Sequence, residues 1–357
     1  MHLCFLGDAG SIHLQRWLAY FSAAGHEVEV VSFRPCTIPG VKVHLLAAGQ
    51  SGRLAYIKGL LKIRRLLQAM QPDILHAHYA TSFGLLAVVS GVRPLVVSAW
   101  GSDVLVAPVK SFWLRQIVRR VLRRADALTS DSSYMSARMQ ELLNNRSKRL
   151  ITVTMGVSRD WFNSILPKEK KPWQILSLRG HQQIYNIEGI IRAMVEVVAS
   201  LPQAKLVVAG EGELTPSLQA LVQSLGLTPN VEFVGQLPHV QVQAYLNESA
   251  VSVSVPFSDA TAVSLLETMA CGAFPVLSDV PANREWVEDG VNGLIVPAED
   301  VHALAQALIR SLKDRNLREK AISVNRQKIL AQAIWEDNMA EVEELYRELL
   351  ARTRGTE

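Results

Sequence analysis

The sequence predicts an α/β protein made of two successive lobes, and three observations carry that prediction. The chain has 357 residues, which is too long for one ordinary core. Short apolar runs alternate with segments whose apolar residues recur at helical spacing, and the whole alternation occurs twice. Between the two series, residues 166–172 read LPKEKKP, a linker-like stretch of prolines and charges. We therefore expect domains at 1–166 and 167–334.

Composition narrows the class of protein. Hydrophobic residues make up 49% of the chain and charged residues 20%, which excludes a disordered or fibrous protein. A formal net charge of +4 is too small a bias to predict nucleic-acid binding. The three cysteines form no CxxC pair, which argues against a disulfide framework and a zinc site.

No membrane span or signal peptide is predicted. The longest uncharged stretch, 74–92, is interrupted by His76, His78 and other polar residues. The N-terminal segment lacks a positive n-region and reaches a turn after six residues, so we interpret it as a buried strand. These features predict a cytoplasmic protein.

The first thirty-two residues indicate a parallel strand–helix–strand unit. Residues 1–6 form an apolar run, Ser11 can cap a helix that Gly25 stops, and 26–32 resume as a strand. The turn Gly7-Asp8-Ala9-Gly10-Ser11 then lies at the carboxyl end of the first strand, where such folds bind ligands. A nicotinamide site is disfavoured because GxGxxG is missing from the turn and the second strand leads to Phe33-Arg34 instead of an acid.

The remaining elements follow the same alternation. The tail 335–350 has apolar residues at helical spacing and acids on its far face, so we expect a helix that packs back on the first lobe. Helices are expected at 83–90, ending near 198 and 224, and at 263–270. Further strands are expected at 73–76, 95–99, 127–130, 174–178, 205–209, 231–234, 251–255 and 274–277.

The most informative segment is 256–272, PFSDATAVSLLETMACG. A strand ends at Val255, and after a turn the helix 263–270 begins, with Thr261 or Asp259 as its candidate cap. Free amides and the helix dipole at such an N-terminus suit a diphosphate, and small residues there let a ligand approach. Asp259 and Glu267 would then offer carboxylates to sugar or ribose hydroxyls. The alternative is an ordinary capping Asp and a solvent-facing Glu.

This segment, DATAVSLLETMACGAFPVLSD followed by NREWVEDGVNGLIVP, resembles the donor-site signature of family 4 glycosyltransferases, and the resemblance runs through the whole chain. It implies the GT-B fold, in which two Rossmann-like domains face each other across a cleft. By resemblance Glu267 holds the ribose hydroxyls, Asp259 contacts the transferred sugar, and the amides near Val263 and Ser264 bind the diphosphate. The family more often has Glu at position 259 and glycines at positions 260 and 262.

Other landmarks of the second lobe fit the resemblance in part. Arg179 follows a strand and is the expected phosphate cation, because a guanidinium can bond phosphate oxygens bidentately. Its alternative role is a surface salt bridge. Tyr185 falls where members carry a second cation, a Lys. The stretch 233–235 resembles the one that cradles the base. The donor-binding residues implied are Arg179, Gly210, Gly212, Gly235, Thr261, Ala262, Val263, Ser264 and Glu267.

Two polar motifs follow strands of the first lobe, His76-Ala77-His78-Tyr79 and Trp100-Gly101-Ser102-Asp103. Both should lie at the ligand-binding edge of the sheet. Family members often have a His where Trp100 stands. A metal held by His76 and His78 lacks an evident third ligand, so no metal is expected. The catalytic candidates are Asp259, Glu267, Asp103 and His78, and the acceptor-site candidates are Gly10, Ser11, His13 and Trp100.

The segment 110–124, KSFWLRQIVRRVLRR, carries six basic residues and no acid. Its apolar residues, including Trp113, recur at helical spacing. Such a helix can lie on an anionic membrane surface, and the alternative is a solvated basic face over a core-facing stripe.

These observations and the resemblance together predict a retaining glycosyltransferase. It would move a sugar from a nucleotide donor, such as a UDP- or GDP-sugar, to a hydroxyl acceptor in polysaccharide, glycolipid or other cell-envelope glycan synthesis. No metal or other cofactor is expected, because protein dipoles can stabilise the leaving diphosphate. The alternatives are a catalytically silent nucleotide-sugar-binding subunit and a nucleotide-sugar 2-epimerase. The enzyme would be cytoplasmic and peripheral on the inner face of the membrane.

Overall fold

The computed structural model describes residues 1–46, 52–144, 146–165 and 169–354. Contacts divide the chain into two compact units, Met1–Thr154 with Met339–Glu357 (unit 1) and Met155–Asn338 (unit 2). The boundary expected between residues 166 and 167 lies outside the described residues.

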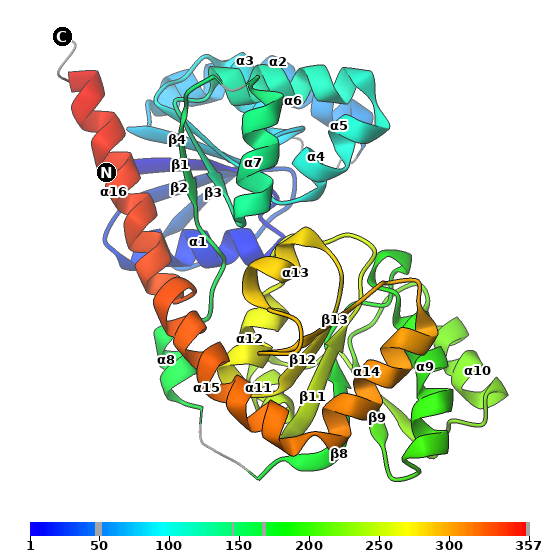
Figure 1. The fold of residues 1–357 in the computed structure, drawn as a ribbon. Coiled ribbons are helices and arrows are strands. Elements are labelled where there is room, and N and C mark those ends of the chain that lie inside the picture. The colour runs from blue at the N-terminus through cyan, green and yellow to red at the C-terminus, as the bar shows by residue number, and fades with distance from the viewer. Residues whose placement is uncertain (47–51, 145, 166–168, 355–357) are drawn as a thin grey trace. The chain divides into compact units, whose positions relative to one another are not determined.

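Unit 1 is built on a seven-stranded parallel sheet in the order β3-β2-β1-β4-β5-β6-β7 (Figure 1). This order, with two strands on one side of β1 and four on the other, is that of a Rossmann-like domain. The strands are short, and those between the edge strands β3 and β7 are mostly apolar and buried, as a parallel sheet covered on both faces requires. The strands are β1 His2–Leu6, β2 Glu27–Ser32, β3 Val41–Leu45, β4 Ile74–His78, β5 Leu95–Ser98, β6 Ala127–Ser130 and β7 Arg149–Thr152.

Helices cover both faces of this sheet. In Figure 1, α1 lies on one side of the sheet and α2 and α3 on the other. The buried faces of α2, α3, α6 and α7 join the strands in one hydrophobic core. The helices are α1 Ile12–Ala23, α2 Arg53–Met70, α3 Phe83–Ser90, α4 Ser102–Leu105, α5 Ala107–Lys110, α6 Phe112–Arg124, α7 Ser133–Leu142 and, from the end of the chain, α16 Trp335–Arg354.

The C-terminal helix α16 belongs to unit 1 from Met339 onward. Tyr346 is fully buried and its hydroxyl lies 2.5 Å from Nδ1 of His76 on β4. The carboxylate of Glu348 accepts a hydrogen bond from the guanidinium of Arg149 at 3.1 Å, so the acidic face of α16 contacts a basic residue of β7. The helix expected at 335–350 is thus present and four residues longer.

Unit 2 contains a six-stranded parallel sheet in the order β10-β9-β8-β11-β12-β13. Successive residues of β8 point to opposite faces of the sheet: Ile175 and Leu176 belong to two different hydrophobic cores, each completed by helices. The strands are β8 Lys171–Ser177, β9 Lys205–Ala209, β10 Val231–Gly235, β11 Ser249–Ser254, β12 Phe274–Ser278 and β13 Leu294–Val296.

The helices of unit 2 flank the sheet on both sides (Figure 1). They are α8 Arg159–Asn163, α9 Ile187–Ser200, α10 Thr215–Ser224, α11 His239–Glu248, α12 Val263–Cys271, α13 Pro281–Trp286, α14 Val301–Lys313 and α15 Arg315–Gln332, with a short 3-10 turn at Gln183–Tyr185.

Two parts of the expected layout were incomplete. Strands β3, β7 and β13 were not predicted, because each is short and β3 and β7 carry polar residues that face solvent. The linker interpretation of 166–172 also extended too far, since Lys171 and Pro172 begin β8.

Lys170, also within the predicted linker, is held by the protein. Its ammonium group donates to the carbonyls of Leu246 and Cys271, and burial lowers its pKa to about 8. Among the described helices, none is both long and apolar enough to span a bilayer.

Candidate functional site

The helix α12 begins just after the carboxyl end of β11, at the edge where parallel sheets bind ligands. Its N-cap is Ala262, in an extended conformation and without a side-chain cap bond, so the expectation that Thr261 or Asp259 caps the helix was wrong. Gly272 closes it in the left-handed conformation. The amides of the first turn, including Val263 and Ser264, have no partner within the helix and form a place for anionic oxygens.

Arg179 lies two residues after the end of β8, and its side chain reaches the start of α12. Its Nη2 lies 2.7 Å from Oδ2 of Asp259, and its Nη1 lies 3.4 Å from Oγ of Ser264 on α12. The guanidinium carbon lies 4.2 Å from the centre of the Tyr185 ring. The aromatic face of Tyr185 thus stabilises the guanidinium of Arg179. Arg179 is buried, so the alternative of a surface salt bridge was wrong.

Asp259 is held by Arg179 rather than by the helix. Burial raises the pKa of its carboxyl, and the charge of Arg179 opposes that rise. Its Oδ1 accepts from the amide of Ala260 at 3.0 Å. The ion pair between Arg179 and Asp259 fixes the direction of the guanidinium. The guanidinium N–H groups that Asp259 does not bind are suited to a ligand's anionic oxygens.

Glu267 lies one turn into α12 and is buried, so the solvent-facing alternative was wrong for it too. Nε2 of His239 lies 2.9 Å from its Oε1, and the His239 ring stacks on Trp161 at a centroid distance of 5.3 Å. A small pocket of about 130 Å³ is lined by Arg179, Ser264 and Glu267 together with Leu178, Gly180, Ala209, Gly210, Gln236, Leu237 and Val242. Cation, hydroxyl and carboxylate therefore converge on one cavity.

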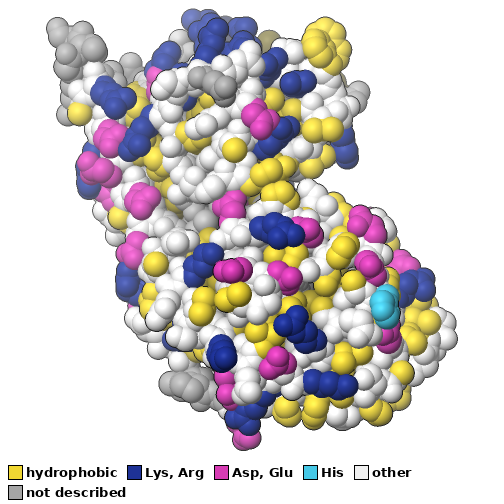
Figure 2. Space-filling model, in the orientation of Figure 1, with side chains coloured by type: hydrophobic (Ala, Val, Ile, Leu, Met, Phe, Trp, Pro, Cys, Tyr) yellow, Lys and Arg dark blue, Asp and Glu magenta, His cyan; other side chains and the backbone are white. Residues whose placement is uncertain are grey.

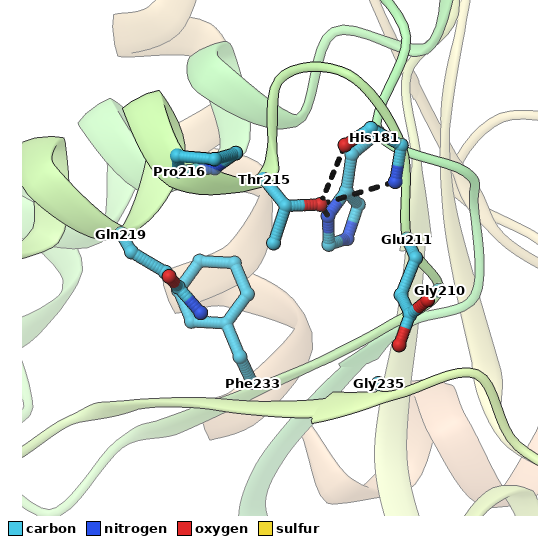
Figure 3. Close-up of a pocket in the computed structure, with 9 residues that line it drawn as sticks. His181, Gly210, Glu211, Thr215, Pro216, Gln219, Phe233 and Gly235 are labelled. Carbon is cyan, nitrogen blue, oxygen red and sulfur yellow. Dashed lines mark hydrogen bonds between the residues drawn. The ribbon is translucent and has the colours of Figure 1, made fainter.

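A second and larger pocket of unit 2, about 630 Å³, shares Gly210 with the first. Figure 3 shows residues that line it. Gly210 has φ +106°, and a Cβ there would lie 2.6 Å from the carbonyl oxygen of Arg179. A Cβ on Gly212 would lie 2.5 Å from the carbonyl oxygen of His181. Both glycines are therefore needed so that the loops after β8 and β9 can touch. The pocket is lined by His181, Gly210, Glu211, Gly212, Thr215, Pro216, Gln219, Phe233 and Gly235.

Unit 1 has a pocket of its own at the carboxyl ends of β1, β4 and β5, with a volume of about 330 Å³. It brings together Ser11, His78 and Trp100, three of the residues predicted from the sequence. Its lining is Asp8, Ser11, Leu14, His78, Tyr79, Ser82, Phe83 and Trp100.

The ring of His78 has a defined tautomer. The indole Nε1 of Trp100 donates to Nδ1 of His78 at 3.1 Å, and because an indole only donates, Nδ1 carries no proton. Burial lowers the pKa of His78 to about 3, so the ring is neutral and Nε2 carries the hydrogen. Nε2 is buried without a protein partner among the described residues. At neutral pH His78 is therefore a hydrogen-bond donor rather than a general base.

Other candidates of unit 1 are placed differently. Asp103 is fully buried, and its carboxylate accepts from the amides of Ala80 and Trp100 at 2.6 and 3.0 Å, so it ties the loops after β4 and β5 together. The ring of His13 meets Trp100 edge-on at 5.6 Å. Gly10 is exposed, and its amide donates to Asp8 at 3.0 Å.

Both ring nitrogens of His76 lie within hydrogen-bond distance of protein groups. Its Nδ1 is paired with Tyr346, and its Nε2 lies 2.7 Å from Oγ of Ser98. Within the described ranges, His2, Glu27 and Glu29 do cluster closely enough to hold an ion, at the opposite end of the sheet from the unit 1 pocket.

Among the polar residues at these sites, sequence reasoning missed His181 and His239. His181 follows Arg179 by two positions, so its place after a strand was the signal that could have indicated it. Tyr79, which the sequence analysis placed at the edge of the sheet, lines the unit 1 pocket with φ 85°. His239 reaches Glu267 from the start of α11, and nothing in the local sequence points to that contact.

Two parallel-sheet units with ligand-sized pockets at the ends of their strands define a protein of the GT-B class. The comparisons agree: residues 2–132 match the family model described as Glycosyl transferase 4-like, and residues 158–328 match the model described as Glycosyl transferases group 1. The chain belongs to family 4 of the GT-B glycosyltransferases, and it is a glycosyltransferase enzyme, as the resemblance predicted.

One curated relative and two solved structures are distant in sequence but match along most of the chain. N-acetyl-α-D-glucosaminyl L-malate synthase of Bacillus anthracis is 22% identical and covers 91% of this chain and 90% of its own. Sucrose-phosphate synthase of Thermosynechococcus elongatus has a TM-score of 0.82 at 19% identity, over 98% of this chain and 99% of its own. Anabaena HepE in complex with UDP-glucose has a TM-score of 0.79 at 16% identity, over 97% and 99%.

Proposed function

We propose that this enzyme transfers a glycosyl unit from a nucleoside diphosphate sugar to a hydroxyl acceptor with retention of anomeric configuration. The observation that carries the proposal is the convergence of Arg179, Ser264 and Glu267 on one pocket at the start of α12. Arg179 and the helix amides would stabilise the departing diphosphate, and Glu267 would accept from the ribose hydroxyls. The solved structure of HepE in complex with UDP-glucose supports this class of donor.

The pocket of unit 1 is the proposed acceptor site. Asp8 and Ser11 offer an acceptor and a hydroxyl there, and the neutral ring of His78 lies in its wall. Such a lining suits the hydroxyls of a sugar or another polyol. Asp103 would act as a positioning residue, because its carboxylate oxygens accept from backbone amides.

Donor screening tests the function. We expect a sugar nucleotide among UDP-, GDP- and ADP-sugars to raise the melting temperature, since a ligand at 100 times its Kd stabilises the folded state by about 2.7 kcal/mol. Product formation from that donor should continue in excess chelator, because the proposed leaving-group stabilisation uses protein groups alone. The anomeric proton coupling of the product reports retention or inversion.

The rival functions give different outcomes in the same assay. Donor binding with neither transfer nor hydrolysis across acceptors would indicate a silent nucleotide-sugar-binding subunit. Conversion of the donor into its 2-epimer, without transfer, would indicate an epimerase. Activity that disappears in chelator and returns with a divalent ion would overturn the metal-free mechanism.

We also propose that unit 1 rests on an anionic membrane surface, where a lipid-linked acceptor for envelope glycan synthesis would be presented. The inner stripe of α6 packs into the core through Val118, Val121 and Leu122, whereas Phe112 and Trp113 at its start are 66% and 75% exposed. The stripe expected from the sequence therefore splits into a core part and an outward aromatic part. Figure 2 shows Lys and Arg side chains gathered over the top of unit 1. Exposed aromatic rings beside basic residues suit a headgroup region.

Vesicle sedimentation tests this surface. We expect the chain to sediment with vesicles of phosphatidylcholine and phosphatidylglycerol more than with phosphatidylcholine alone, and Phe112→Ser with Trp113→Ser to lower the bound fraction several-fold. Val240→Ser is the matched control, because Val240 is 78% exposed but lies on unit 2. Equal binding to both vesicle types, or equal losses in both variants, would contradict the proposal.

A further inference from the structure

The pocket that carries the proposed donor site is lined from two neighbouring helices, α11 and α12. Val242 lies on α11, and Ser264 and Glu267 lie on α12. Leu246 of α11 and Leu266 of α12 belong to one hydrophobic core, so the two helices pack together. Because the helices have only ten and nine residues, a tilt or a slide at one end moves the pocket residues as well.

The C-terminal end of α12 is closed by two cations. The last four carbonyls of an α-helix have no donor within the helix. In α12, backbone amides that follow the helix pair with two of these carbonyls. The other two belong to Ala270 and Cys271. Arg326 of α15 donates to the carbonyl of Ala270 at 2.7 Å, and Lys170 donates to that of Cys271 at 3.0 Å.

Lys170 also holds the C-terminal end of α11. Its Nζ lies 2.9 Å from the carbonyl oxygen of Leu246 in the last turn of that helix, so one ammonium group bonds both helices. Positive charge at a helix C-terminus complements the helix dipole, and hydrogen bonds from a charged donor are stronger than neutral ones. Lys170 therefore joins the ends of α11 and α12 that lie away from the pocket.

The charge on Lys170 changes close to neutral pH. Burial lowers the pKa of Lys170 to about 8, so the group is charged at pH 7 and neutral well above pH 8. The neutral amine keeps two hydrogens for the two carbonyls, so the bonds remain while the charge is lost. Burial raises the pKa of the Cys271 thiol to about 12, which keeps it uncharged in this range. The charged side chains near that thiol and the helix ends are Glu267 on α12, Arg326 on α15 and Glu248 on α11, which pairs with Lys171.

We propose that Lys170 is a positioning residue of the donor site: it ties the C-terminal ends of α11 and α12 together and so holds the pocket residues of both helices in place. The inference rests on the proposed function, because it assumes that this pocket binds the sugar nucleotide. It adds a form of regulation to that site. While Lys170 is charged, it offsets the negative ends of both helix dipoles, and the N-terminal amides of α12 bind a diphosphate more strongly.

Nucleotide affinity of the full chain tests the role of Lys170. UDP, GDP and ADP are titrated by calorimetry, and the nucleotide that binds most tightly serves as the probe. We expect Lys170→Met, which removes both hydrogen bonds, to raise the Kd of this probe by about 3- to 30-fold. Lys170→Arg keeps the charge and several N–H donors, so it should recover most of the affinity.

Lys328→Met is the matched control. Lys328 is also a partly buried lysine of unit 2 whose pKa is lowered by burial. It donates to a backbone carbonyl at 2.6 Å, but that carbonyl belongs to Glu285 on α13. The control variant should lower the melting temperature, as Lys170→Met does, and leave the Kd of the probe unchanged.

A pH series separates positioning from stability. In the wild-type chain we expect the Kd of the probe to rise about two- to fivefold as the pH passes 8, the effect of removing a charge from a helix end. Lys170→Arg should lack this rise because a guanidinium stays charged, and the ratio of the two proteins cancels ionisation of the probe itself. Stability moves the other way. The unfolded chain keeps the lysine proton to higher pH, so the contribution of Lys170 to the free energy of unfolding increases above pH 8.

The outcomes distinguish the two proposals. An unchanged Kd in Lys170→Met, an equal change in Lys328→Met, or identical pH profiles for the wild type and Lys170→Arg would overturn the role of Lys170 and leave the proposed function standing. If Lys170→Met does not fold, the two pH profiles still decide the question. Absence of any nucleotide binding by the wild-type chain, with no sugar transfer, would overturn both.

Discussion

Arg179→Gln is expected to lower kcat/KM for sugar transfer by about 100- to 1000-fold, the range seen when one donor to a developing negative charge is removed. Arg179 is the cation that the structure holds between Asp259 and Ser264, and its guanidinium lies over the ring of Tyr185. Arg179→Lys should recover only part of the rate, because an ammonium lacks the planar fork that bonds two oxygens at once. Steady-state kinetics with the preferred donor measure both.

The same substitution leaves the largely buried carboxylate of Asp259 without its partner, which would lower stability as well. The double variant Arg179→Gln with Asp259→Asn removes that unpaired charge and serves as the control. Its melting temperature should return toward the wild-type value while transfer stays slow. Recovery of the rate in the double variant would mean that Arg179 acts only through stability.

Glu267→Gln is expected to raise KM for the sugar nucleotide by about 10- to 100-fold, since hydrogen bonds to a charged group contribute about 1.5 to 3 kcal/mol. The amide keeps the shape of the side chain but loses the charge that strengthens bonds to ribose hydroxyls. Because the ribose is held alike in the ground and transition states, kcat should change less than KM. Michaelis–Menten analysis at saturating acceptor separates the two constants.

Two further variants make the Glu267 prediction specific. Glu232→Gln, on the exposed side of β10, should leave KM unchanged. His239→Ala removes the partner of Glu267 and should raise KM less than Glu267→Gln does, because it loosens the carboxylate without removing it. A kcat that falls with KM unchanged would contradict ribose binding and would place Glu267 at the reacting centre instead.

The helix α12 shows what local sequence can predict. Its start at Val263 and its end before Gly272 follow from small residues, apolar spacing and a glycine that accepts the left-handed conformation. Most strand positions followed in the same way from short apolar runs. The cap was mistaken, because side-chain preference favours Thr261 or Asp259 over Ala262, whereas the backbone of the turn places Ala262 at the cap position.

Pairings across the chain were beyond such reasoning. Asp259 and Arg179 are eighty positions apart, and a buried ion pair between them depends on β8 and β11 lying side by side. The role of Trp100 is similar in kind. Its indole N–H fixes the tautomer of His78, which the sequence presents only as a residue type, and a tautomer depends on what surrounds the ring.

The sequence by itself determined the α/β architecture, the family and the segment that starts α12, because periodicity, turn residues and motif spacing are local properties that neighbours along the chain enforce. Only the tertiary structure decided which groups are charged, which donate and which accept. Those properties follow from burial and from partners brought together by sheet order, and strands adjacent in a sheet are distant in sequence.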